Sequence, residues 1–377
     1  MSEPIKKIPV ARPFFGKHEA IYTNDAVTSG EISGNFGKYI SRFENEFAAY
    51  CGTRHGISTN NGTTALHVAI AALGIGRGDE VLVQTFTNMA TVFAVLYTGA
   101  TPIAVDIELD TWNLNPALLE KKITPKTKAI IVVHIFGHPV DMDPVNIVAK
   151  KHGLFVIEDA AEAHGAEYKG KRVGSLSDIA CFSFYANKII TTGEGGMVVT
   201  NSRELADKVR TLHSLSYGGG ENKFMHESVG FNYRMSNVIA ALGCAQLENI
   251  EKVIEMKRGI AAYYNKALAG ISALQLPVEK EYAKNVYWMY HVVLRGKLAG
   301  RRREVMTALK EKGIETRESF TPMNEQKIFL KEGLVKKEEC PVANEIGANG
   351  FYIPSGPIIS EDELGHVVES LKDTLKK

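Results

Sequence analysis

The chain has 377 residues, of which 45% are apolar and 23% are charged, and its formal net charge is +1. This composition is typical of a globular protein, and the absence of long charged runs gives no indication of a nucleic acid or an acidic membrane as a partner. The length suits two or three domain-sized units, or one large α/β domain with a smaller one beside it.

The cysteines and the N-terminus indicate where the protein resides. Four cysteines lie far apart, at positions 51, 181, 244 and 340, without a C-x-x-C pair. This spacing argues against a zinc site or a disulfide framework and fits a reducing compartment. Residues 1–16 lack an apolar signal core, and apolar runs such as 130–136 are too short to span a bilayer. We therefore expect a cytoplasmic protein that does not enter a membrane.

The N-terminal quarter combines a loop with two predicted helices. Residues 1–40 are mixed in character, with glycines that mark a loop. Apolar residues at helical spacing predict helices over 41–50 and 63–73. Gly62 and the two asparagines before it precede the second helix, and capping residues there leave free N–H groups pointing forward. Such a helix start binds anions readily, although an ordinary N-cap would have the same sequence.

Strand and helix signals then alternate along the chain. The predicted strands are 80–84, 101–106, 129–134 and 154–159, and the predicted helices between them are 88–97 and 144–151. Strands separated by helices indicate parallel βαβ units and hence a doubly wound sheet. The site of such a sheet lies at the carboxyl ends of its strands.

The pattern changes after about residue 250. A long predicted helix, 236–268, leads to a strand at 286–294 and to helices at 302–312 and 361–376. We expect a smaller α+β domain here. The expected domains are therefore residues 1–250 and residues 251–377.

One lysine, Lys188, lies between an apolar run and a group of glycines. The run 179–185 predicts a buried strand, 197–200 predicts the next strand, and three glycines stand at positions 193, 195 and 196. A partly desolvated lysine in such a turn would have its ammonium form disfavoured. Schiff-base chemistry requires a neutral amine of this kind. A solvated lysine in a strand connection is the alternative interpretation.

Two further side chains stand at the ends of predicted strands. Asp159 ends the strand 154–159, and a carboxylate at the tip of a parallel strand can hold a cationic ring nitrogen in place. It could equally cap a helix. Ser183 could donate its hydroxyl to a phosphate, or it could be a strand serine that bonds within the protein.

Three other classes of enzyme agree less well with the sequence. A G-x-G-x-G run begins at Gly74, but it lacks the dinucleotide spacing and follows a helix. Tyr185 and Lys188 are three positions apart, whereas the short-chain dehydrogenase pair needs four. His134 and His138 fall at a strand end and in a turn, without an H-E-x-x-H helix, so we expect them to be structural rather than metal ligands. A G-x-S-x-G nucleophile motif is also missing.

Five motifs follow one another along the chain. They are Asn61-Gly-Thr-Thr-Ala-Leu-His, Gly137-His-Pro-Val-Asp-Met-Asp, Glu158-Asp-Ala-Ala-Glu-Ala-His-Gly-Ala, Ser183-Phe-Tyr-Ala-Asn-Lys-Ile-Ile-Thr-Thr-Gly-Glu-Gly-Gly and Gly230-Phe-Asn-Tyr-Arg-Met-Ser. In order and spacing they resemble the DegT/DnrJ/EryC1/StrS sugar aminotransferases from about residue 10 to the C-terminus. The resemblance implies pyridoxal 5′-phosphate (PLP) on a type I aminotransferase fold. That fold has a large domain with a doubly wound, mostly parallel sheet and a smaller C-terminal α+β domain.

The resemblance assigns roles to individual positions. Lys188 would form the Schiff base with the cofactor and shuttle protons, and Asp159 would pair with the pyridine nitrogen. The residues expected to hold the phosphate are Gly62, Thr63, Thr64, Ser183 and, from the partner subunit of a homodimer, Asn232. The implied homodimer has its sites at the subunit interface.

Two positions depart from the usual family pattern. Asn88 stands where the family usually places an aromatic ring against the cofactor. Glu162 stands where many relatives have glutamine and would contact the ring oxygen. The loop 212–227, which contains a Gly218-Gly-Gly run, lies near the nucleotide sugar in relatives.

The resemblance also implies a reaction. Glutamate would donate its amino group, leaving 2-oxoglutarate, and the group would pass to C4 of a nucleotide-linked 4-keto-6-deoxy sugar. The wording of the second and fourth motifs is most similar to members that act on GDP-4-keto-6-deoxymannose. Other UDP- or dTDP-linked keto sugars, aminated at C3 or C4, remain alternatives. So do a PLP-dependent sugar dehydratase, whose known form has histidine in place of the lysine, and a non-catalytic protein of the same fold.

Overall fold

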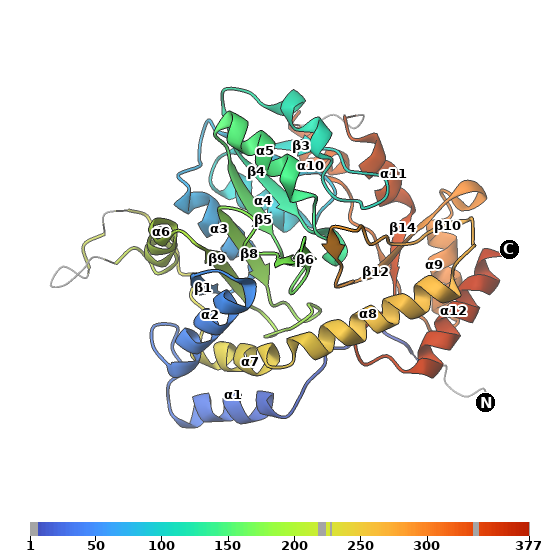
Figure 1. Ribbon diagram of the computed structural model, residues 1–377, viewed down its shortest axis with the longest axis horizontal. Helices are drawn as coiled ribbons and strands as arrows, with labels where there is room; N and C mark the ends of the chain where they lie inside the picture. Colours follow the sequence, from blue (N-terminus) through green and yellow to red (C-terminus); the bar gives the residue numbers. More distant parts are fainter. Residues whose placement is uncertain (1–6, 218–223, 227, 335–338, 377) are drawn as a thin grey trace.

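The computed structural model describes residues 7–217, 224–226, 228–334 and 339–376. Its main element is a seven-stranded sheet with the order β1-β9-β8-β5-β4-β2-β3 (Figure 1). The strands are β1 (His55–Thr59), β2 (Glu80–Gln84), β3 (Thr101–Val105), β4 (Thr127–Val133), β5 (Phe155–Asp159), β8 (Ile179–Ser183) and β9 (Gly196–Thr200). β9 runs antiparallel to both of its neighbours, and the other neighbouring strands pair in parallel. The predicted mostly parallel sheet is confirmed.

Helices cover both faces of this sheet. In β4, Ile130 and Val132 join a hydrophobic cluster with Val145 of α5 (Met142–His152). The residue between them, Ile131, joins the main cluster with Leu66 of α3 (Gly62–Ala72). Because successive side chains of a strand point to opposite faces, a run of β-branched residues buried on both sides is the pattern of an inner parallel strand. The sheet is therefore doubly wound, as expected.

Residues 1–40 held no predicted helix, but α1 (His18–Thr28) lies there, and the loop marked by glycines follows it. Ala26 of this helix is fully buried, whereas Ile21 and Val27 are more than half exposed. The helix therefore has no continuous apolar stripe to reveal it in the sequence. It packs against α7 (Asn237–Leu247), which also packs against α2 (Lys38–Cys51). These tertiary contacts support α1.

The single helix expected over 236–268 is two helices, α7 and α8 (Ile250–Ala267). Asn249 lies between them with φ −106° and ψ 2°, outside regular helix geometry. Its side-chain Nδ2 donates to Ala245 O over 3.1 Å, while its own carbonyl accepts from Val253 N. An asparagine that bonds the backbone in this way competes with the helical hydrogen bonds. The apolar spacing continues across the break, so the pattern did not reveal it.

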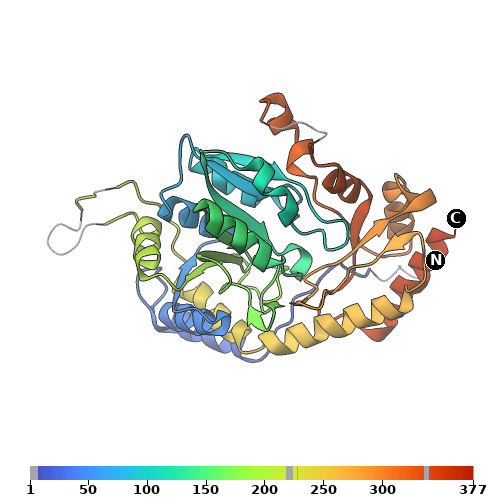
Figure 2. The same ribbon diagram turned by 45° about the horizontal axis from the view of Figure 1, so that its top comes forward.

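α8 connects the large sheet to the C-terminal part of the chain (Figure 2). A four-stranded sheet there has the order β10-β12-β14-β13, and all of its neighbouring strands pair antiparallel. Its elements are β10 (Leu274–Gln275), β12 (Tyr290–Leu294), β13 (Arg317–Glu318), β14 (Gly350–Ile353), α9 (Arg302–Glu311), α10 (Lys327–Lys331), α11 (Pro341–Asn349) and α12 (Glu361–Leu375). The strand expected over 286–294 begins only at Tyr290.

α8 contributes to two hydrophobic cores. Its residue Ile254 belongs to the core of the large sheet, and Tyr264 belongs to the core of the C-terminal sheet, together with Ile8 from the N-terminal arm. A domain boundary at residue 250 therefore stays a prediction. The remaining named elements are α4 (Met89–Tyr97), α6 (Arg203–His213) and a small sheet of β6 (Glu167–Tyr168), β7 (Lys171–Arg172) and β11 (Ala283–Lys284). No helix in the described part of the chain is long and apolar enough to cross a bilayer.

Candidate active site

A cavity of about 1030 Å³ lies at the carboxyl ends of β2, β4, β5 and β8. Parallel strands of an open sheet commonly present their ligand site at this edge. The cavity brings together the following predicted site residues: Gly62, Thr63, Thr64, Asn88, Asp159, Glu162, Ser183 and Lys188. Asn232 is not among the lining residues. It is exposed and forms an isolated bridge with Ser214.

The start of α3 forms one corner of the cavity. Asn61 caps the helix, since its Oδ1 accepts from Thr64 N over 2.9 Å. A Cβ on Gly62 would lie only 2.7 Å from Ser183 Cβ, so glycine allows the helix start to approach the end of β8. The N–H groups of a first helical turn have no partner within the helix and attract negative charge. This corner is therefore suited to a phosphate group.

Asp159 lies at the end of β5 and is only 4% exposed. Its Oδ2 accepts from Thr91 Oγ1 over 2.7 Å, and its Oδ1 accepts from Ala161 N over 3.1 Å. The residues that follow it form turns, so it does not cap a helix. Burial raises the pKa of Asp159, and the two donors partly oppose this rise. The ionised form of such a buried carboxylate would be strongly stabilised by a cationic partner.

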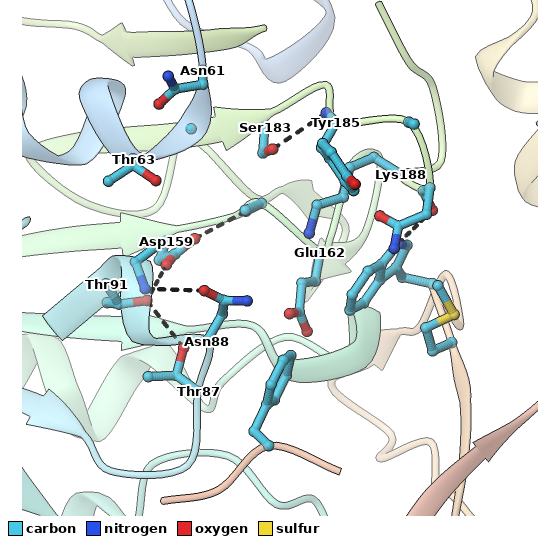
Figure 3. Close-up of a pocket in the computed structure, with 18 of the residues that line it drawn as sticks. Asn61, Thr63, Thr87, Asn88, Thr91, Asp159, Glu162, Ser183, Tyr185 and Lys188 are labelled. Atoms are coloured by element: carbon cyan, nitrogen blue, oxygen red, sulfur yellow. Dashed lines mark hydrogen bonds between the residues drawn. The ribbon is translucent and has the colours of Figure 1, made fainter. Parts of the chain in front are cut away.

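Lys188 extends from the turn after β8 into the cavity, toward Asp159 and Glu162 (Figure 3). Its side chain is half-buried, and burial lowers the pKa of the amine, while the nearby carboxylates of Glu162 and Asp159 oppose this shift. Burial also raises the pKa of Glu162, whose Oε2 accepts from Phe136 N over 2.8 Å. An amine in this position, with its pKa lowered by burial, is suited to nucleophilic chemistry.

Asn88 and Ser183 already bond to nearby backbone amides. Asn88 Oδ1 accepts from Ala90 N over 3.0 Å and caps α4. Ser183 Oγ accepts from Tyr185 N over 3.3 Å, which leaves its hydroxyl hydrogen for another acceptor. Contact of either side chain with a cofactor stays a prediction.

His134 and His138 form hydrogen bonds inside the protein. His134 Nε2 lies 3.0 Å from Glu158 Oε2, and its Nδ1 accepts from Val140 N. His138 Nε2 accepts from Lys280 N over 3.2 Å. Across the described ranges, no three His, Cys, Asp or Glu side chains are grouped so that they could hold a metal ion.

Several lining residues were not singled out by the sequence. Thr91 donates to Asp159 and lies 3.0 Å from Thr87 Oγ1, so α4 orients the carboxylate. The C-terminal part of the chain contributes Trp288, Met289, Phe320 and Tyr352. Trp288 is one of only two tryptophans, and this rarity was the one signal that could have drawn attention to it.

Comparison with known proteins places the chain. The model of the DegT/DnrJ/EryC1/StrS aminotransferase family matches residues 15–372. The chain belongs to this family. It is 43% identical over 370 residues to GDP-perosamine synthase of Escherichia coli O157:H7. The alignment covers 98% of this chain and 99% of the synthase.

Solved structures agree with this placement. DesV from S. venezuelae has a TM-score of 0.90 at 34% identity and covers 99% of both chains. Spr1654 from Streptococcus pneumoniae in its PLP-form has a TM-score of 0.93 at 26% identity, with 98% of this chain and 99% of that chain covered. The chain is thus a PLP-dependent sugar aminotransferase with the type I aminotransferase fold.

The residues of the cavity suit this cofactor. PLP carries a phosphate, a ring nitrogen that can be protonated, and an aldehyde. The start of α3, the buried carboxylate of Asp159 and the amine of Lys188 are complementary to these three groups in that order.

Proposed function

We propose that this aminotransferase moves the amino group of glutamate to C4 of GDP-4-keto-6-deoxymannose and produces GDP-perosamine. The observation that carries the proposal is the full-length similarity, at 43% identity, to a GDP-perosamine synthase. In the overall reaction the sugar's keto oxygen is replaced by the amino group, and glutamate becomes 2-oxoglutarate. Atoms and electrons balance without a further oxidant or reductant.

The chain's own residues would perform distinct tasks. PLP, when bound, supplies an electron sink for the carbon that loses its proton. Lys188 would hold the cofactor covalently, and its free amine would take a proton from the α-carbon of glutamate and return one to C4 of the sugar. Asp159 would keep the ring nitrogen protonated. Gly62, Thr63, Thr64 and Ser183 would hold the phosphate.

The carboxylate of Glu162 would lie near the ring oxygen, and Asn88 would line the face where relatives have an aromatic ring. Both side chains line the same cavity as Lys188. Because Glu162 is buried and its pKa is raised, it can hold a proton near neutral pH and donate a hydrogen bond, as the more common glutamine does.

We further propose a homodimer in which Asn232 of the partner subunit completes the phosphate site. Two observations support it. Asn232 is exposed and lies outside the cavity of its own chain. Three apolar side chains that precede it in the chain, Phe224, Met225 and Val229, are exposed by 79%, 68% and 84%. Exposed apolar groups of this size are common at interfaces. Residues 218–223 and 227 of the loop 212–227, including the Gly218-Gly-Gly run, lie outside the described residues.

The substrate is tested by supplying glutamate with a panel of GDP-, UDP- and dTDP-linked keto sugars. We expect GDP-4-keto-6-deoxymannose to turn over fastest, with one 2-oxoglutarate released for each 4-amino sugar identified by NMR. Faster turnover of a UDP- or dTDP-linked sugar, or amination at C3, would show that the proposed substrate is wrong. A deoxygenated sugar without an amino group would indicate a dehydratase instead.

The role of Lys188 is tested separately by borohydride reduction and peptide mapping. We expect the pyridoxyl group on Lys188 alone, and none in Lys188→Ala, which should still bind added cofactor without transamination. A label on a different lysine would refute the assignment, whatever the substrate panel shows.

A further inference from the structure

A short segment of the C-terminal part, residues 285–289, packs against the large sheet. Val286 N donates to Gly137 O over 3.2 Å, and Asn285 Oδ1 accepts from Tyr287 N over 2.8 Å. Tyr287 has φ 48°, so the backbone turns sharply here. Gly137 makes the approach possible, because a Cβ there would lie 2.8 Å from Val286 Cγ2 and 2.9 Å from Tyr287 N. The segment therefore places Trp288 at a fixed position.

Trp288 contacts the turn that carries Lys188 in two ways. The Lys188 Nζ lies 3.9 Å from the centroid of its ring, within the range of a cation–π contact. The indole Nε1–H donates to Asn187 O over 2.7 Å. Trp288 is only 5% exposed, so both contacts are shielded from water. One side chain thus fixes the reactive amine and the backbone just before it.

A buried lysine holds Trp288 from the other side. Lys257 of α8 donates from Nζ to Trp288 O over 2.9 Å and to Ser355 O. Ser355 Oγ lies 3.3 Å from the same nitrogen and accepts from Tyr290 N. Burial lowers the pKa of Lys257 to about 7. A neutral amine satisfies the same contacts by donating two hydrogens and accepting one.

We propose that Trp288 is a positioning residue for Lys188 and that Lys257 holds Trp288 in place. This inference rests on the proposed function of Lys188 as the reactive amine. The titratable groups that face Lys188 are Glu162, Asp159 and His164. In the cofactor-free enzyme the carboxylates of Glu162 and Asp159 attract the Lys188 ammonium, and the indole face of Trp288 stabilises it from another side. The indole N–H keeps the turn in the orientation in which Nζ points into the cavity.

The two contacts predict separable effects in a labelling experiment. Cofactor-free protein is mixed with PLP at a series of pH values and trapped with borohydride, and label on Lys188 is quantified by peptide mapping. Trp288→Leu removes the ring face, so the midpoint of the pH profile should fall by about one unit. Its limiting rate should fall about fivefold, as for loss of one buried hydrogen bond. Trp288→Phe keeps the face and loses the N–H, so the rate should fall while the midpoint stays.

Trp112, the other tryptophan, provides the matched control. It is 2% exposed and packs against Phe136 and His291. Trp112→Leu should lower thermal stability and leave the Lys188 profile unchanged. Lys257→Met should lower the limiting rate less than Trp288→Leu does, because the indole remains. Circular dichroism checks the fold of each variant.

Three results would overturn the proposal. One is a folded Trp288→Leu protein with the wild-type midpoint and rate. Another is an equal shift in Trp112→Leu, which would make the effect one of general stability. If Trp288→Leu does not fold, a wild-type limiting rate of labelling in Trp288→Phe would overturn the proposal. Label on a different lysine in the wild-type protein would refute the proposed function as well, whereas unchanged kinetics at a labelled Lys188 refute only the role of Trp288.

Discussion

Replacement of Asp159 by asparagine tests the electrostatic arrangement of the site with little change of shape. The carboxylate is buried and accepts from Thr91 Oγ1 and Ala161 N. An asparagine oxygen can keep the bond from Ala161. Its NH₂ group would then face Thr91, whose hydroxyl can rotate to accept. We therefore expect Asp159→Asn to fold, with a loss of about 1–2 kcal/mol in the free energy of unfolding.

The loss in rate should be much larger than the loss in stability. A carboxylate about 4 Å from a ring cation, at an effective dielectric constant of about 20, contributes about 4 kcal/mol. If that attraction keeps the ring protonated while the α-carbon of glutamate loses its proton, its removal slows the step by about a thousandfold. The amide is neutral and replaces little of this attraction.

The assay is a single-turnover reaction of PLP-loaded protein with glutamate, followed by the absorbance of the cofactor. The matched control is Asp106→Asn. Asp106 is also buried and follows the end of β3, where it accepts from Val342 N and Ala343 N at the start of α11. We expect this control to lose stability and keep its rate. A rate for Asp159→Asn within tenfold of wild type, with PLP bound and the fold intact, would refute the reasoning.

Three other outcomes can be measured. In the first, inactive Lys188→Ala and Asn232→Asp proteins are mixed under conditions that exchange subunits. Up to about a quarter of wild-type activity should return, because one of the two sites in each mixed dimer has wild-type Lys188 and Asn232. If exchange is demonstrated and no activity returns, Asn232 serves the site of its own chain. Burial lowers the pKa of Lys257 to about 7, against about 10.4 in the unfolded chain. Between these two pH values the unfolded state therefore binds more protons than the folded state. In urea unfolding, the free energy of unfolding of the wild type should rise relative to that of Lys257→Met from pH 7 to pH 9, by at most about 1.4 kcal/mol per pH unit. A difference that does not change with pH would contradict the lowered pKa of Lys257. Gly62→Ala places a Cβ 2.7 Å from a side chain of β8, so it should lower the free energy of unfolding by about 1–3 kcal/mol and weaken PLP binding. The control Gly259→Ala adds a Cβ in open space on α8 and should leave thermal stability unchanged or slightly raised.

The sequence predicted the parts of the fold that follow from periodicity and chain order. Runs such as Thr127–Val133 and Phe155–Asp159 combine β-branched residues with burial along most of their length, which is typical of inner parallel strands. Their carboxyl ends share one edge, so Asp159 and Lys188 could be expected near each other. Family motifs then supplied roles that spacing alone left open.

The elements that were missed depend on contacts between distant residues. α1 has no apolar stripe and is held by α7, and Asn249 interrupts a continuous apolar pattern through one side-chain bond to Ala245 O. Trp288 and Thr91 reach the cavity only because their segments pack against the sheet. Local sequence has no signal for such packing, since neither residue type nor spacing specifies which distant backbone will lie opposite.

The pairing of β1 with β9 has a consequence for biosynthesis. His55 lies opposite Thr200, and Thr59 lies opposite Gly196, so the first strand to be translated finds its partner only when the last strand of the sheet has left the ribosome. Until β9 is available, β1 has no partner strand, whereas the parallel strands β2, β3, β4 and β5 can already pair with one another. The start of α3 directly follows β1. The corner at the start of α3, which we propose for the cofactor's phosphate, therefore cannot form on a nascent chain shorter than about 200 residues. We expect capture of PLP to be a late event in synthesis.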